Sequence, residues 1–305
     1  MSDPGIDLHL HTTASDGRLR PSALVALAAQ NGLRVLSVTD HDTVAGVAEA
    51  REAAAAYGVR VVTGIEMTAV DSGRDVHVLG YFFAADDGEF NRFLEVQRQA
   101  RVERVREIAV RLQALNCGID VEALLAATPA ASGRSIGRPL VADALVAAGH
   151  ATDRRDAFDR LLGNDQPAFV PRCGPGVAQV IAAITGAGGI ASLAHPALLA
   201  TDDRIPGYAA SGLSALEVRH RDHTPADEQR YRRLAATLGL AVSGGSDFHG
   251  PREGRLPRLP IDDGPDWTPG AVTLGAEDFA ALEARVPARP SAKDAAPAQK
   301  ANPHA

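Results

Sequence analysis

The sequence predicts an α/β fold in which βα units surround a parallel sheet and a block of helices interrupts the series. Short runs rich in β-branched residues end in polar side chains and alternate with helical stretches rich in Ala and Leu. From about residue 88 to residue 171 the sequence is almost entirely helical instead. At 305 residues, 45% of them apolar, the chain is long enough to bury a full core.

The amino-terminal part of the chain contains four strand-like runs and two helices. A helix is predicted between Pro21 and Gln30, because Pro favours a first helical turn and Gly32 follows the last. A second helix is predicted over residues 43–57 and is closed by Gly58. The predicted strands cover residues 6–11, 34–39, 60–65 and 75–83, the last as part of a hairpin.

Alternation of strands and helices resumes after the helical block. Helices are predicted at residues 177–185 and 227–238, and strands at 190–194, 215–218 and 240–243. The predicted core domain is therefore discontinuous, with residues 1–87 and 172–287 forming it and residues 88–171 forming an inserted helical subdomain. Residues 288–305 are rich in Pro, Ala and charged residues without apolar periodicity, which predicts a disordered tail.

Composition excludes several classes of protein. The formal net charge of −7 argues against a platform for duplex nucleic acid, and the absence of a long apolar run argues against a membrane span. The start of the sequence shows no secretory signal, so we expect a cytoplasmic location. Cys117 and Cys173 lie in unrelated contexts and are expected to be ordinary thiols. Nothing in the sequence indicates the oligomeric state.

Histidines and carboxylates cluster where the predicted strands end. His9 and His11 lie two apart on a strand, so their side chains leave the same face and can reach one ion. Alone, such a pair could equally be an exposed polar pair. Six of the ten histidines, however, lie at or just beyond strand ends, where a βα barrel places its active site. The candidate metal ligands are His9, His11, Asp16, His41, Glu66, His77, His195, Asp247 and His249.

These ligand types narrow the choice of metal. Imidazole and carboxylate groups suit zinc, manganese or iron and do not suit a metal that prefers thiolate ligands. Nine ligands exceed what one tetrahedral ion uses, so at least two divalent ions are expected, with a carboxylate such as Glu66 free to bridge them. The identity of the metal stays open.

The motifs HLHTTASDG, VTDHDT, GIEMT, DVHVLGY, LAHP and GGSDFHG resemble those of the PHP (polymerase and histidinol phosphatase) family, between His9 and Gly250. They are most similar to its nucleoside bisphosphate phosphatase and RNase AM branch. The resemblance implies a distorted (β/α)7 barrel and a trinuclear metal centre. It also implies three ligand groups: His9, His11, Glu66 and Asp247; Asp16, His41 and His249; and Glu66, His77 and His195.

The insert carries a segment, GRSIGRPLVADALVAAG, that is similar to the GRPH segment of the family, in which an Arg faces the substrate phosphate. Arg138 matches that Arg, whereas Leu140 stands where relatives commonly have His, which puts a second polar contact in question. Arg134 is a further candidate for substrate binding, because a guanidinium can grip phosphate through two parallel hydrogen bonds. Arg172 could also reach phosphate.

Other polar residues near strand ends receive less specific interpretations. Glu217, His220 and His223 follow or end a strand and are interpreted as ordinary residues of the rim. Asp40 precedes His41 and is expected to orient a ligand histidine, since metal-bound imidazoles usually need such a partner.

The resulting hypothesis is a metal-dependent phosphoesterase that hydrolyses phosphate esters of nucleotides. Its substrate would be a phosphorylated small molecule or a short oligonucleotide. A water bridging two ions would attack phosphorus in line, while the ions and Arg138 stabilise the developing charge. Asp247, His249 and Arg138 are the candidate catalytic residues. The alternatives are a phosphatase for another metabolite, such as histidinol phosphate, and a non-catalytic PHP binding module; the intact set of ligands argues against the module.

Overall fold

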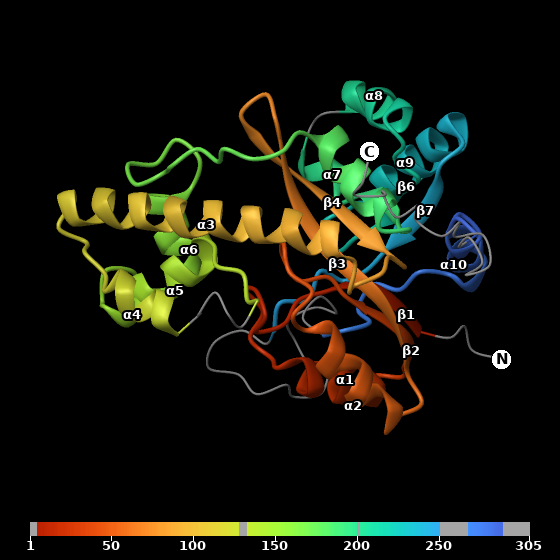
Figure 1. Ribbon diagram of the computed structural model, residues 1–305, viewed down its shortest axis with the longest axis horizontal. Helices are drawn as coiled ribbons and strands as arrows, with labels where there is room; N and C mark the ends of the chain where they lie inside the picture. The colour runs from red at the N-terminus through yellow and green to blue at the C-terminus, as the bar shows by residue number, and fades with distance from the viewer. Residues whose placement is uncertain (1–4, 128–132, 200–201, 251–267, 289–305) are drawn as a thin grey trace, which may run out of the picture.

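A computed structural model describes residues 5–127, 133–199, 202–250 and 268–288 of the chain. Its centre is a seven-stranded sheet whose strands follow one another in chain order (Figure 1). The strands are β1 (Gly5–Leu10), β2 (Leu33–Val38), β3 (Arg60–Asp71), β4 (Arg74–Tyr81), β5 (Ile190–Leu193), β6 (Ala215–Arg219) and β7 (Ala241–Gly244). The α/β fold with a mostly parallel sheet is therefore confirmed.

Only β4 runs against the other strands of the sheet. It pairs antiparallel with both β3 and β5, while β1 to β3 and β5 to β7 pair in parallel. Among the described residues, the two ends of the sheet meet through one isolated bridge, between Leu10 and Phe248. A side chain at Gly245 would collide with the backbone of His9, so a glycine lets this loop pass close to β1. The sheet thus curves toward closure, with a bridge in place of a ladder at the seam.

Helices cover the outside of the sheet and bury its apolar side chains. Leu24 and Ala50 place α1 and α2 in one apolar cluster with β1 and β2, while Ile184 and Tyr231 place α7 and α9 in the main cluster with β3 to β7. Two helices, α8 and α10, were not predicted from the sequence. The covering helices are α1 (Pro21–Gln30), α2 (Val47–Ala55), α7 (Val177–Gly186), α8 (Ile205–Ala210), α9 (Pro225–Leu238) and α10 (Ala276–Glu283), with short 3-10 turns η3 (Pro196–Leu198) and η4 (Asp202–Arg204).

The predicted helical block extends away from the sheet (Figure 1). It contains α3 (Gly88–Ala114), α4 (Val121–Ala126), α5 (Arg138–Ala147), α6 (Arg154–Ala157) and the π-helical turn η2 (Phe158–Leu162). Phe90 and Leu94, in the first turns of α3, pack in the main core, whereas Ile108 and Leu112 belong to a separate apolar cluster built within residues 102–170. We therefore propose that residues 88–171 form an inserted subdomain within the barrel domain of residues 1–87 and 172–287.

Other expectations concern the termini, the membrane and the cysteines. No helix of the described segments combines the length and apolarity needed to cross a membrane. Cys117 and Cys173 are both free thiols, as expected. The predicted disordered tail lies outside the described residues from position 289 onward.

Candidate metal centre

The nine candidate ligands meet at the edge where the parallel strands end. Six lie near the end of a strand or in the loop that follows β1, β2, β5 or β7: His9, His11, His41, His195, Asp247 and His249. Asp16 lies in the loop after β1, and Glu66 lies within β3, where it bridges to His41. Because β4 is reversed, His77 in the first half of this strand reaches the same edge. The structure therefore brings together all the ligands that the sequence predicts.

Glu66 occupies the middle of this cluster and is almost completely buried. Five histidines surround its carboxylate at contact distance. Oε2 lies 3.3 Å from His9 Nε2, 3.2 Å from His11 Nε2 and 3.2 Å from His41 Nδ1, and Oε1 lies 2.8 Å from His77 Nδ1 and 3.1 Å from His195 Nε2. Both oxygens thus have several ligand nitrogens beside them, which is the arrangement of a carboxylate able to bridge two ions.

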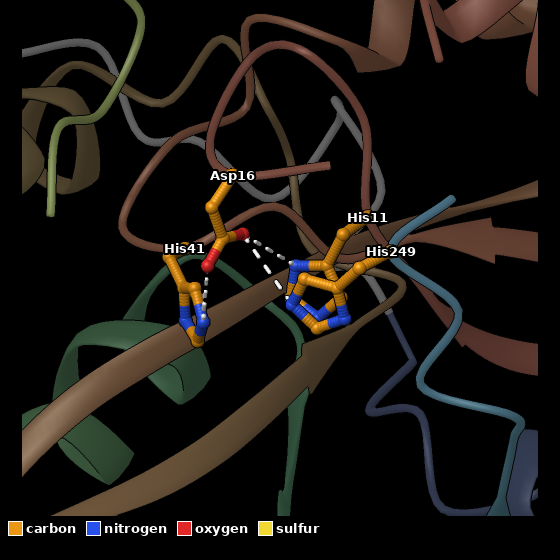
Figure 2. A group of neighbouring side chains, drawn as sticks. All are labelled: His11, Asp16, His41 and His249. Atoms are coloured by element: carbon orange, nitrogen blue, oxygen red, sulfur yellow. Dashed lines mark ion pairs between the residues drawn. The ribbon is translucent and has the colours of Figure 1, made fainter. Parts of the chain in front are cut away.

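A second group forms around Asp16 (Figure 2). Its Oδ1 lies 3.6 Å from His11 Nδ1 and 3.5 Å from His249 Nε2, and its Oδ2 lies 3.7 Å from His41 Nε2. The rings of His11 and His249 stack with centroids 4.0 Å apart. One ligand atom from each of the four residues lies within 4.8 Å of the others. The predicted group of three therefore gains His11 as a fourth neighbour.

The other two groups also form around Glu66. His9, His11, Glu66 and Asp247 come together as the resemblance implies, with Asp247 Oδ1 lying 3.3 Å from His9 Nε2 and 3.1 Å from His11 Nε2. The remaining cluster contains His41, Glu66 and His77. His195 lies beside it, since its Nε2 is 3.3 Å from His77 Nδ1. His41 is thus placed between two groups.

The hydrogen-bonding state of these residues fits divalent metal ions. His9 Nε2, both ring nitrogens of His11 and His41 Nδ1 are buried without a hydrogen-bond partner, which is costly for a polar atom that nothing else binds. Burial opposes ionisation of Glu66 and Asp16, yet the neighbouring histidines hold the pKa of both carboxyl groups well below its usual range. Ionised carboxylates are the ligand state that binds such ions, and the histidine nitrogens would bind an ion once they release their protons.

The interpretation of Glu217 as a residue of the rim is wrong. This residue is fully buried in β6 and is not an ordinary rim residue. Its carboxylate lies 2.9 Å from His9 Nδ1 and accepts a hydrogen bond from the backbone N–H of His195 at 2.7 Å. This contact directs His9 Nε2 toward the cluster, as the hydrogen-bonded partner of a metal-binding imidazole does. The alternation Leu216-Glu217-Val218 was the available signal, because it places Glu217 on the opposite face of β6 from its two apolar neighbours.

His220 and His223 are also buried, contrary to the rim interpretation. His220 Nε2 lies 3.5 Å from Asp247 Oδ2, and His220 joins His9 and Glu217 in a further cluster of possible ligand atoms. His223 places Nδ1 against the carbonyl oxygen of Val218 at 2.8 Å. His220 therefore contacts the centre directly, whereas His223 packs behind it.

Asp40 was predicted to orient a ligand histidine, but its hydrogen-bond partners among the described residues are Thr12 and Ser15. It accepts hydrogen bonds from the backbone and side chain of Thr12 at 2.8 and 2.7 Å, and from Ser15 Oγ at 2.6 Å. These three donors lie in the loop that carries Asp16. Asp40 therefore shapes this loop, and a short hydroxyl-rich segment before Asp16 was a signal that the sequence offered.

Asp7 is a supporting residue that sequence reasoning missed. Its carboxylate accepts hydrogen bonds from Ser246 N at 2.9 Å, Ser246 Oγ at 2.6 Å and Gly270 N at 2.9 Å. Burial raises its pKa to about 6 despite these donors. Asp7 ties β1 to the loop that carries Asp247, and its position two residues before His9, on the same strand face, was the available signal.

Three residues beside the candidate metal centre adopt left-handed backbone angles, each in the loop after a strand. Asp42, His195 and Asp247 have φ values of 50°, 28° and 51°. Such angles in residues other than glycine cost on the order of 1–3 kcal/mol and persist where the surroundings enforce them. Here they turn the chain sharply after β2, β5 and β7, so that His195 and Asp247 face the centre.

The candidate arginines approach this edge from the insert. Arg138, the first residue of α5, donates to the carbonyl oxygen of Leu162 at 3.2 Å and to Asn164 Oδ1 at 3.1 Å. Arg134 Nε donates to the carbonyl oxygen of Thr13 at 2.6 Å, in the loop after His11. Leu140 packs against the apolar cluster of the insert.

Known proteins match this chain over most of its length. The PHP domain pattern matches residues 7–138. The chain is 35% identical over 250 residues to a 5′-3′ exoribonuclease of Haemophilus influenzae, covering 80% of this chain and 90% of the relative. It is 31% identical over 254 residues to a 3′,5′-nucleoside bisphosphate phosphatase of Chromobacterium violaceum, covering 82% and 88%. It is 32% identical over 280 residues to a phosphoribosyl 1,2-cyclic phosphate 1,2-diphosphodiesterase of Eggerthella lenta, covering 83% and 97%.

Solved structures agree with these matches. A Bifidobacterium adolescentis protein assigned as a metal-dependent phosphoesterase superposes with a TM-score of 0.80 at 33% identity, covering 94% of this chain and 98% of the other. An amidohydrolase of Chromobacterium violaceum with bound sulfate gives a TM-score of 0.76 at 29% identity, covering 95% and 100%. Fold and site together define the class of metal-dependent phosphoesterases. Within that class, the chain belongs to the PHP family.

Proposed function

We propose that this protein hydrolyses phosphate esters of nucleotides, of the nucleoside 3′,5′-bisphosphate or 5′-phosphorylated oligoribonucleotide type. The observation that carries the proposal is the buried Glu66 carboxylate with five histidines around it and Asp16 and Asp247 beside them. The relatives named above are an exoribonuclease, a nucleotide phosphatase and a cyclic phosphodiesterase, and all three act on phosphate ester bonds. The substrate is a phosphorylated small molecule or a short oligonucleotide rather than a duplex.

The ligand groups account for two or three divalent ions, of manganese, iron or zinc. Bound ions of this kind lower the pKa of a water ligand and stabilise charge on phosphoryl oxygens. Residues of the chain hold the ligands in place: Glu217 orients His9, Asp40 shapes the loop of Asp16, and Asp7 fixes the loop of Asp247.

Exposure of the ligands indicates where the substrate enters. The side chains of His249 and His77 are 26% and 24% exposed, whereas His9 and His11 are completely buried. The open side thus carries His249 and His77. We propose that Asp247, His249 and Arg138 are the catalytic residues, and that Arg138 and Arg134 bind phosphate there.

The test is a panel of phosphate esters offered to purified protein loaded with manganese or zinc. The panel contains a nucleoside 3′,5′-bisphosphate, a short 5′-phosphorylated RNA and histidinol phosphate, with release of phosphate or mononucleotide as the readout. We expect turnover of the first two and at least two ions per chain by elemental analysis. Preference for histidinol phosphate would reassign the substrate, and a protein with only trace metal that added manganese does not activate would contradict the proposal.

A further inference from the structure

Outside the nine candidate ligands, three guanidinium groups converge on the carboxylate of Asp75. Arg138 Nη2 lies 3.6 Å from Asp75 Oδ2, Arg104 Nη1 lies 3.9 Å from the same oxygen, and Arg172 Nε lies 3.9 Å from Oδ1. Hydrogen bonds between Arg and carboxylate are about 2.7–2.9 Å long, so these contacts are ion pairs without hydrogen bonds. No described residue donates a hydrogen bond to Asp75, and its side chain is 26% exposed. It can therefore rotate away.

The neighbouring charges leave this cluster positive. Arg101 is buried beside it and donates to Asp42 Oδ2 at 2.6 Å and to Thr68 Oγ1 at 3.0 Å, and Arg172 also donates to Asp42 at 3.2 Å. Four guanidinium groups thus face two carboxylates. The nearby acidic residues of α3 have their own partners, because Glu103 pairs with Arg106 and Glu107 pairs with Arg111.

Some of these guanidinium donors are buried and unused. Arg104 Nη2 and Arg172 Nε have no hydrogen-bond partner, and the two side chains are only 11% and 7% exposed. Burial lowers the pKa of Arg104 to about 10, so it stays protonated at neutral pH. An unsatisfied charged donor in a buried position is costly unless an anion binds it. The donors and the excess charge therefore point to a ligand that is an anion with several oxygens.

The hairpin of β3 and β4 places this cluster next to the metal centre. Its register pairs Thr68 with His77 and Val70 with Asp75. Residues two apart on a strand leave the same face, so Asp75 projects from the side that carries His77, about 7 Å further along the strand. An anion that replaces the Asp75 carboxylate among the guanidinium groups would thus lie beside a phosphate held near His77. The distance between the two is about 7 Å along the strand, which one nucleotide can span.

We propose that Arg104 and Arg172 form a second anion subsite that binds the phosphate of the substrate that is not hydrolysed, next to Arg138, which the proposed function assigns to the reacting phosphate. The inference rests on the proposed function, because it needs a substrate with two phosphate groups. In the free protein Asp75 is the internal counter-ion of the subsite. A phosphate brings more oxygens than the carboxylate and can accept from donors that Asp75 leaves unused. The subsite therefore selects bisphosphorylated nucleotides or oligonucleotides over monophosphates.

The test compares steady-state kinetics on two substrates, a nucleoside 3′,5′-bisphosphate and the monophosphate that carries only the hydrolysed phosphate. Arg104→Gln is expected to lower the ratio of kcat/KM for bisphosphate over monophosphate by about tenfold, mainly through KM for the bisphosphate. Asp75→Asn is expected to raise this ratio, because it removes the competing negative charge. Arg106→Gln changes an exposed arginine of the same helix and is the matched control, with an unchanged ratio.

The outcomes separate this inference from the proposed function. An unchanged ratio in Arg104→Gln and Asp75→Asn, or an equal loss on both substrates, overturns the subsite and leaves the phosphoesterase activity standing. If the metal-loaded wild type hydrolyses neither substrate, the proposed function fails, and calorimetric titration with the bisphosphate still decides the subsite. Weaker binding to Arg104→Gln than to Arg106→Gln then supports it, and equal binding overturns it. Should Arg104→Gln fail to fold, Asp75→Asn gives the same decision.

Discussion

At the sheet edge, buried carboxylates lie among imidazoles whose ring nitrogens lack hydrogen-bond partners. On the adjoining face of the insert, by contrast, buried guanidinium groups outnumber the carboxylates beside them. The two regions therefore bury charge of opposite sign. Glu66 exemplifies the first and Arg104 the second. The edge suits cations and the insert suits anions, and a phosphate ester bound through metal ions requires both.

The two regions also differ in how the chain builds them. The ligands of the edge come from strand ends, and supporting residues such as Asp7 and Glu217 come from the same strands. The arginines come from α3, the start of α5 and the segment that returns to the sheet at Arg172. We therefore expect a change in the insert to alter recognition of the proposed substrate without disturbing the candidate metal ligands.

The largest effect is expected from Glu66→Gln, which tests whether the edge is a metal centre. The substitution keeps the size of the side chain but removes the charge that five histidines share. We expect loss of bound metal and a fall in kcat of at least about 1000-fold, since metal ions supply several kcal/mol of charge stabilisation. Elemental analysis and phosphate release measure the two effects. Glu49→Gln, a change at a partly buried carboxylate outside the centre that accepts hydrogen bonds from Ser22, is the control. A fully metallated, active Glu66→Gln protein would contradict the assignment.

Removal of metal should destabilise the edge. Ions that bind the folded state alone stabilise it by mass action, by about 2.7 kcal/mol at a ligand concentration one hundred times Kd. Chelation should therefore lower Tm by several degrees, and added manganese or zinc should restore it. Thermal unfolding followed by circular dichroism checks this, and an equal Tm with and without chelator would be evidence against tightly bound ions.

A smaller effect is expected from Glu217→Gln, which tests the support behind the edge. The variant weakens the contact that orients His9 and leaves the ligand itself in place. Loss of such a partner typically costs about 10–100-fold in metal affinity. Competition with a chromophoric chelator measures this change. The control is Glu228→Gln, which removes only a surface pair with Arg219; if both variants bind metal like the wild type, Glu217 does not position His9.

The same contrast explains what could be predicted from the sequence. His9 and His11 were predictable because strand periodicity fixes which way neighbouring side chains point, and the parallel strands bring their ends to one edge. The extension of β3 to Asp71 was not predictable from the sequence, because it depends on pairing with β4 in the hairpin. The convergence of Arg104 on Asp75 was not predictable either, since the two residues come together only when the insert packs on the hairpin. Periodicity predicts faces, whereas contacts between distant segments require the packed structure.

The smallest effect is expected from Arg138→Lys, which sharpens the comparison where the two regions meet. Arg138 contacts Asp75 on one side and the insert, through Leu162 and Asn164, on the other. Lys keeps the charge but lacks the planar fork that can bind two phosphate oxygens at once. We expect kcat/KM on a nucleoside bisphosphate to fall by about three- to tenfold. Metal content should not change, because Arg138 belongs to the anion-binding side. Kinetics with elemental analysis on the same preparation measure both quantities. Wild-type kinetics in fully metallated Arg138→Lys and Arg138→Ala would show that Arg138 only holds the insert together, and Arg134 or Arg172 would then be the next residue to test.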